Sequence, residues 1–170
     1  MKPYLIFFFS YLLVGCDFLT MDRIPTEVQI KTSFGPFLVG ASSIKGIYSN
    51  MDVDSAVFEY KTDNENALLD ISERLISKKW SVVSSENRQL VVTRRKNPGE
   101  GELHFHSFEL AKLAFENGYI CVGYVQADTN ERVTGMLGQE AGEIQWADKK
   151  IWPKYNSCVN SHNKSHHSQP

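Results

Sequence analysis

The sequence lacks the features that define several large classes of protein. Its one long apolar run, residues 4–13, is shorter than the roughly 20 residues that a membrane-spanning helix needs. The formal net charge is −2, so there is no basic excess of the kind that nucleic-acid binding requires. Internal repeats and long low-complexity tracts are absent too. These absences leave a single small domain that is not expected to bind nucleic acid.

Motifs that identify a reaction are also missing. There is no G-x-S-x-G nucleophile elbow, and no S-x-x-K accompanied by K-T-G. The glycine-containing stretch 40–46 lacks the order G-x-x-x-x-G-K-[ST] of a phosphate-binding loop. We therefore expect no cofactor, and a role in binding is favoured over an enzymatic one.

The N-terminus carries the most specific pattern in the chain. Lys2 precedes the apolar run, which is typical of a secretory signal. The run ends in Leu13-Val14-Gly15-Cys16, which resembles the lipobox of bacterial lipoproteins at all four positions. The resemblance implies that residues 1–15 are a cleaved signal peptide. It also implies that the Cys16 sulfur carries diacylglycerol, often with acylation of the new amino group. Residues 16–27 then form a lipidated tether, and the mature domain shows no comparable resemblance.

The residue after the lipidated cysteine bears on location. An aspartate there, as Asp17 is here, resembles the inner-membrane retention signal of enterobacterial lipoproteins. The resemblance favours the periplasmic side of the inner membrane, with the outer membrane as the alternative. Two or more acyl chains would hold the protein firmly on either membrane.

The two remaining cysteines, Cys121 and Cys158, form an even pair. Exported domains stand in an oxidising compartment, so we expect a disulfide between them. The alternative is two buried free thiols. They stand too far apart in sequence to be a C-x-x-C redox motif.

Hydrophobic periodicity predicts an α+β domain over residues 28–160. The clearest element is a helix from Thr62 to about Lys79, because Thr62 and Glu65 fit a capping box and the apolar residues recur at helical spacing. Its predicted buried face consists of Leu68, Ile71, Leu75 and Ile76. Alternation predicts strands at residues 28–31, 37–39, 55–61, 80–85, 89–95 and 119–126, with 40–54 irregular.

The stretch 103–116 fits two structures. Asn117-Gly118 before the strand at 119–126 favours a long hairpin, and the alternative is a helix over 108–116. Residues 144–152 are expected to form a last strand or an apolar clasp, which Cys158 would tie to the strand at 119–126. Residues 161–170 are expected to be a disordered tail. The predicted fold is therefore an antiparallel β-sheet with one main amphipathic helix packed on one face.

Candidate metal ligands are His104 and His106, which would share one face of a strand. They could bind zinc or copper with help from His162, His166 or His167, although no fixed spacing completes the site and solvent-facing histidines are the favoured interpretation.

Candidate partner-binding residues are Arg94 and Arg95, at a strand end, and Trp152, as an exposed aromatic anchor. For the two arginines a solvated strand edge is the favoured interpretation. The acid pairs Asp52 with Asp54 and Glu140 with Glu143 could serve a hydrolase only if they lined a cleft.

Together these patterns predict a lipid-anchored protein of the bacterial cell envelope that faces the periplasm. Its expected role is non-catalytic: binding a partner protein, as small immunity-type lipoproteins do, or serving as an accessory subunit. The alternative is an envelope hydrolase acting on cell-wall glycan or lipid.

Overall fold

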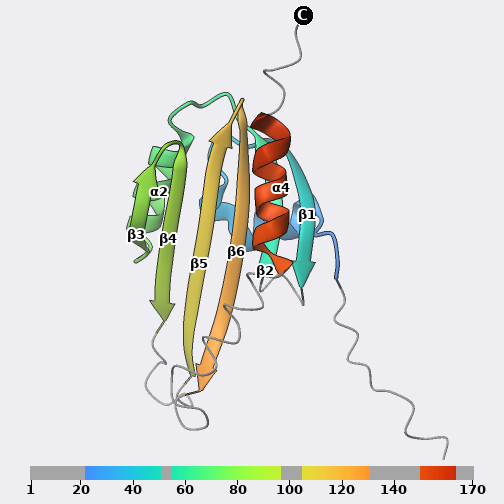
Figure 1. Ribbon diagram of the computed structural model, residues 1–170. Coiled ribbons are helices and arrows are strands. Elements are labelled where there is room, and N and C mark those ends of the chain that lie inside the picture. The colour runs from blue at the N-terminus through green and yellow to red at the C-terminus, as the bar shows by residue number, and fades with distance from the viewer. Residues whose placement is uncertain (1–21, 51–54, 97–104, 131–149, 164–170) are drawn as a thin grey trace, which may run out of the picture.

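The computed structural model describes residues 22–50, 55–96, 105–130 and 150–163. Six strands form one antiparallel sheet in the order β1-β2-β6-β5-β4-β3 (Figure 1). The strands are β1 (Ser42–Asn50), β2 (Ser55–Lys61), β3 (Ser81–Glu86), β4 (Gln89–Lys96), β5 (Phe105–Glu116) and β6 (Tyr119–Asn130). The predicted α+β class with a helix packed on the sheet is confirmed.

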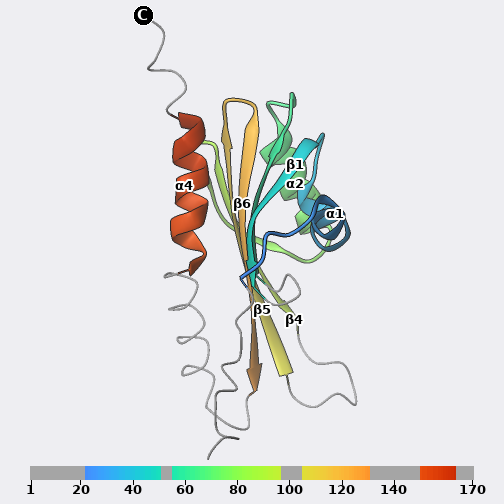
Figure 2. The same ribbon diagram turned by 90° about the vertical axis from the view of Figure 1, so that its right-hand side faces the viewer.

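Helices lie on both faces of the sheet (Figure 2). One face is covered by α1 (Glu27–Phe34), the short 3-10 helix η1 (Gly35–Phe37) and α2 (Ala67–Ile76). The other face carries α4 (Trp152–Asn163), which the sequence did not predict. Each face has its own apolar core, so the central strands are buried on both sides.

Helix α2 is the predicted helix, but it is shorter than residues 62–79. It begins at Ala67, and the capping box predicted at Thr62 and Glu65 does not form. The buried Thr62 hydroxyl instead donates to the carbonyl oxygen of Val39, so it holds the segment that follows η1 against the end of β2. Ile71 and Leu75 are buried as predicted and Leu68 is partly buried, whereas Ile76 is 55 % exposed and lies outside the buried face.

Residues 28–31 belong to a helix, so the strand predicted there is wrong. A capping box does start this helix: the Gln29 backbone N–H donates to the Thr26 hydroxyl, and the Thr26 N–H donates to the Gln29 side chain. Ile30 and Phe34, one turn apart, are buried in the core. The tether boundary at residue 27 is also too late, because Arg23 and Ser49 already pair their backbones.

Two further segments differ from the prediction. Residues 35–37 form a 3-10 turn where the strand 37–39 was expected. Residues 42–50 form the edge strand β1 where irregular chain was expected. Its register is interrupted between Ser42 and Ile44 and again between Gly46 and Tyr48, which breaks the alternation that would reveal a strand.

The long hairpin over 105–130 confirms the preferred interpretation of residues 103–116. Asn117 and Gly118 both have positive φ, which is the backbone conformation that a two-residue hairpin turn needs. At the other end of the chain, Ile151 lies in a turn and Trp152 begins α4, so the end of the segment 144–152 is not a strand, while residues 144–149 lie outside the described residues. Helix α4 was not predicted. It runs through Asn163, so residues 161–163 are helical and the predicted disordered tail starts too early. Residues 164–170 lie outside the described residues.

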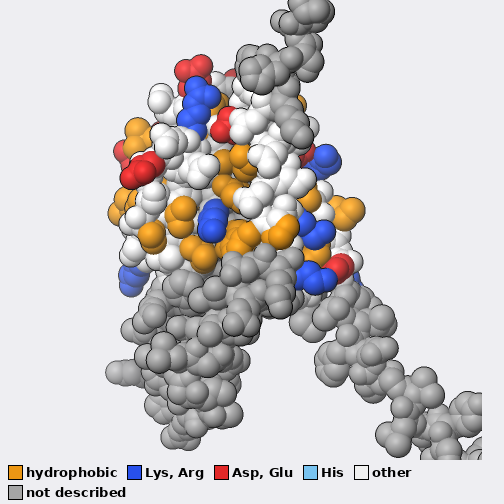
Figure 3. All heavy atoms as spheres, viewed as in Figure 1, with side chains coloured by type: hydrophobic (Ala, Val, Ile, Leu, Met, Phe, Trp, Pro, Cys, Tyr) orange, Lys and Arg blue, Asp and Glu red, His pale blue; other side chains and the backbone are white. Residues whose placement is uncertain are grey.

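Helix α4 leaves part of its face of the sheet uncovered. A groove of about 390 Å³ runs beside it and is lined in part by Val91, Lys112, Tyr155 and Val159. The Lys112 ammonium lies 4.2 Å from the centroid of the Trp152 ring. In the view of Figure 3, apolar side chains gather beside α4, with basic side chains among them.

Candidate functional site

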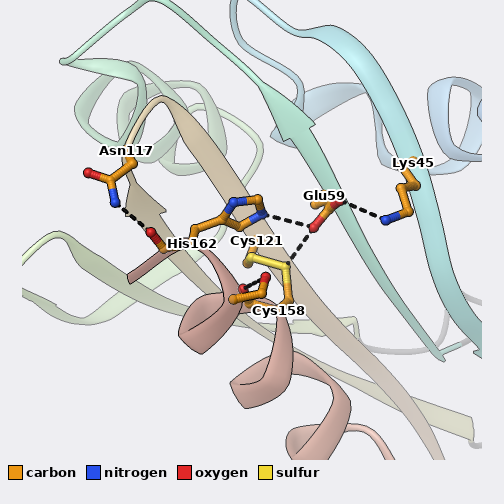
Figure 4. Close-up of polar contacts among 7 residues, drawn as sticks. Lys45, Glu59, Asn117, Cys121, Cys158 and His162 are labelled. Carbon is orange, nitrogen blue, oxygen red and sulfur yellow. Dashed lines mark hydrogen bonds and ion pairs between the residues drawn. A yellow bond between two sulfur atoms is a disulfide. The ribbon is translucent and has the colours of Figure 1, made fainter. Parts of the chain in front are cut away.

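The candidate site lies where the C-terminal half of α4 meets strands β2 and β6. Glu59 of β2 and Cys121 of β6 are directly opposite each other in the sheet register, so they share a face. Cys158 and His162 are one helical turn apart on α4 and therefore also share a face. Packing the helix on the sheet brings all four side chains together (Figure 4).

Cys121 and Cys158 form the predicted disulfide. Their Cα atoms are 6.1 Å apart, within the range that a disulfide spans. The two residues are only 1 % and 4 % exposed. The bond therefore fastens α4 to the middle of the sheet and is almost fully buried.

Glu59 is the polar centre of the site. Its Oε1 accepts a hydrogen bond from Lys45 Nζ at 3.2 Å. Its Oε2 lies 3.0 Å from His162 Nε2 and 3.3 Å from Cys158 Sγ. The side chains of Glu59 and His162 are only 12 % and 17 % exposed. One carboxylate thus joins β1, β2 and α4.

Two contacts fix the orientation of His162. Its ring stacks on Tyr119, with centroids 4.1 Å apart and planes within 11°. Its backbone carbonyl accepts a hydrogen bond from the side-chain amide of Asn117, in the β5–β6 turn. Sequence reasoning missed both Glu59 and the role of His162. The spacing Cys158-x-x-x-His162, typical of one helix face, was the available signal.

The predicted partner residue Arg94 is engaged inside the domain. Its guanidinium pairs with Glu109, which is 2 % exposed, and lies 4.8 Å from the centroid of the Trp80 ring. The hydroxyl of Tyr124 also donates to Glu109. The hydrogen bond to Glu109 raises the pKa of the Arg94 guanidinium above its ordinary value. Arg94 therefore stabilises the sheet from within, and because its side chain is still partly exposed, its role in partner binding stays a prediction.

Trp152 is 8 % exposed and packs on Gly123 under α4, so the exposed anchor predicted there is wrong. For an aromatic ring of this size, burial against the sheet is more favourable than exposure to solvent. Arg95 pairs with Phe108 in the sheet, but its side chain lies outside the described residues.

The predicted histidine site does not form with His162. His106 pairs with Thr129, ten residues along β5 from the Glu116–Tyr119 pair beside which His162 sits. The side chain of His106 and the whole of His104 lie outside the described residues. So do Cys16, Asp17, His166, His167 and the acids Asp52, Asp54, Glu140 and Glu143.

A second feature is a hollow of about 750 Å³ at the turn end of the sheet. It lies between the start of α2 and the turns β3–β4 and β5–β6. Its wall carries the acids Asp63, Glu65 and Glu86, together with Arg88, whose guanidinium lies 5.9 Å from the centroid of the Phe115 ring. The β1–β2 hairpin, beside which Arg23 pairs with Ser49, is at the opposite end of β2.

Fold and site together define a small α+β domain whose C-terminal helix is held to the sheet by a disulfide. No protein-family model matches the sequence, and no curated protein and no solved structure matches it either. None of the helices within the described ranges has the length and apolar character needed to cross a bilayer.

Proposed function

We propose that this chain is a bacterial lipoprotein that binds a partner protein at the cell envelope without catalysing a reaction. The observation that supports this most is the buried Cys121–Cys158 disulfide downstream of the lipobox-like Leu13-Val14-Gly15-Cys16. Disulfides persist in oxidising compartments such as the periplasm, where a lipoprotein signal would deliver the domain. Two independent features therefore favour export.

The anchor would hold one end of the domain close to the membrane. The described chain begins at Asp22, six residues after Cys16, and six residues reach at most about 20 Å when fully extended. Arg23 then joins the edge of β1 near the β1–β2 hairpin. That end of the sheet would face the lipid headgroups, on the periplasmic side of the inner membrane if Asp17 acts as a retention signal.

The hollow at the opposite end would face away from the membrane. Three acids and one arginine on its wall suit a protein surface that offers basic and hydrogen-bonding groups. A membrane-distal binding surface on a small anchored domain fits an immunity-type protein that intercepts a toxin, or an accessory subunit of an envelope assembly.

The anchor is tested by expressing the full chain and its Cys16→Ser variant in a bacterial host. We expect the unaltered chain in the membrane fraction, without residues 1–15 and with a mass increase that corresponds to diacylglycerol. The variant should lose both the lipid and the membrane association. Retention of Met1, or an unmodified thiol at Cys16 in the mature chain, would refute the proposal.

The binding surface is tested by crosslinking on intact cells of the natural host. A partner should be recovered with the unaltered chain and lost with Glu65→Lys and Glu86→Lys, which reverse charges on the wall of the hollow. Glu73→Lys is the matched control, since Glu73 is exposed on α2 outside the hollow. If Glu65→Lys and Glu86→Lys capture as much partner as the control does, the hollow is not the binding surface.

A further inference from the structure

We propose that Glu59, Cys121, Cys158 and His162 form a zinc site once the Cys121–Cys158 disulfide is reduced. The four residues each offer one ligand atom, and these atoms all lie within 4.8 Å of one another. Two thiolates, an imidazole and a carboxylate are all zinc ligands, and four ligands satisfy a tetrahedral ion. This proposal does not depend on the lipid anchor.

The present distances need little adjustment to receive the ion. With metal–ligand bonds of about 2.0–2.3 Å, neighbouring ligand atoms of a tetrahedral zinc site stand about 3.3–3.8 Å apart. Glu59 Oε2 already lies 3.0 Å from His162 Nε2 and 3.3 Å from Cys158 Sγ. After reduction the two sulfurs must separate by about 1.7 Å in all, from a bonded pair to ligands about 3.8 Å apart.

The groups around the four ligands already orient them. Lys45 binds Oε1 of Glu59, which leaves Oε2 directed at the other ligands (Figure 4). Stacking on Tyr119 fixes the plane of the His162 ring, so that Nε2 faces Glu59. Contacts of this kind from outside the ligand set raise metal affinity by fixing ligand geometry.

The charges also balance. Two thiolates neutralise the zinc ion, the Glu59 carboxylate adds one negative charge, and the ammonium of Lys45 offsets it at 3.2 Å. A neutral site suits its surroundings, since both sulfurs are almost fully buried. With all four positions filled by side chains, the ion would hold α4 to the sheet rather than act on a substrate.

The reaction that opens the site is thiol–disulfide exchange with a dithiol reductant. The reductant gives two electrons and two protons and becomes a disulfide itself, while Cys121 and Cys158 become thiols. Zinc then displaces the two thiol protons to solvent as it binds the thiolates. Because both states use the same two sulfurs, the disulfide and the metal exclude each other. Helix α4 would be fastened to the sheet in either redox state.

The test uses the full chain carrying Cys16→Ser, so that only Cys121 and Cys158 can supply thiolates. The protein is reduced with a phosphine, which leaves no competing thiol, and is titrated with Co²⁺ under anaerobic conditions. We expect one equivalent of Co²⁺ to give tetrahedral d–d bands and a thiolate charge-transfer band, both lost on adding Zn²⁺. The oxidised protein should give neither band.

Variants identify the ligands. Glu59→Gln and His162→Phe should each weaken Co²⁺ binding at least 10-fold, and the phenylalanine keeps a ring to stack on Tyr119. Adding Cys121→Ser and Cys158→Ser should abolish the charge-transfer band. The matched control is Asn160→Ala, an exposed position on α4, and it should bind as the parent does.

Circular dichroism separates ligation from folding. If the reduced chain loses structure, recovery of the native spectrum on adding Zn²⁺ supports the proposal. A folded reduced chain that gives no charge-transfer band with stoichiometric Co²⁺ would overturn it. So would Glu59→Gln and His162→Phe variants that both bind Co²⁺ as tightly as Asn160→Ala.

Discussion

At the scale of single residues, Gly123 is the position that allows α4 to pack closely against the sheet. It lies on β6 directly beneath the helix. A Cβ atom there would stand 2.9 Å from the Trp152 ring and 3.2 Å from Tyr155 Cβ. The absence of a side chain lets the two aromatic residues pack against the strand, so glycine is required by contact rather than by backbone conformation.

We therefore predict that Gly123→Ala destabilises the domain by about 1–3 kcal/mol, because the added methyl group overpacks this contact. Gly35→Ala is the matched control, since its Cβ would meet nothing within 4 Å. Denaturant unfolding of both variants measures the difference. If the two variants unfold at the same denaturant concentration, α4 can move away from the added methyl group without loss of stability.

At the scale of elements, the disulfide adds a covalent link to the apolar packing that holds α4 on the sheet. Reducing the bond, or replacing both cysteines with alanine, frees a loop of 37 residues in the unfolded chain. In the chain-entropy model this costs about 4 kcal/mol. We expect amides of α4 to exchange hydrogen much faster than those of α2 in a Cys121→Ala/Cys158→Ala variant kept free of metal. Equal acceleration in both helices would instead indicate global unfolding.

The sequence could predict those elements whose own residues show the turn signal, the strand alternation or the helical spacing of apolar side chains. The turn at Asn117 and Gly118 and the alternation at 119–126 predicted the central hairpin, because a two-residue turn of this type is a local property. The face of α2 was predictable for the same reason. Edge strand β1 was missed because its register breaks twice, and α1 was missed because Val28 and Ile30 also fit an alternating pattern.

The candidate site was predictable only in part. An even pair of cysteines in an exported chain was enough to predict the disulfide. Glu59 could not be found, because its closeness to His162 depends on the register of β2 against β6 and on where α4 lies. Glu59 and His162 are 103 positions apart, and no local period encodes such a contact.

At the scale of the whole molecule, buried tyrosines make stability depend on alkaline pH. Burial raises the pKa of the Tyr48, Tyr60 and Tyr155 hydroxyls well above the ordinary value of 10.0. The unfolded chain loses these protons near pH 10 while the folded chain keeps them, so folding is favoured fully below that pH. Stability then falls as the pH rises above 10, by about 1.4 kcal/mol per pH unit for each tyrosine.

Denaturant unfolding at pH 9, 10 and 11 measures this dependence, with tyrosinate absorbance as an independent signal. The free energy of unfolding should be flat up to about pH 10 and fall beyond it. In a Tyr155→Phe variant the decline should be about two-thirds as steep, because one of the three protons is no longer involved. A free energy that stays constant to pH 11 would contradict the assignment.

The bond between Cys121 and Cys158 also determines whether cleavage of the backbone separates the chain into fragments. Residues 131–149 lie between the two bridged positions. Cleavage of any single peptide bond in that stretch yields two polypeptides that remain one covalent particle until the bridge is opened. Such a nicked form would migrate as an intact chain on a denaturing gel run without reductant and as two fragments with it.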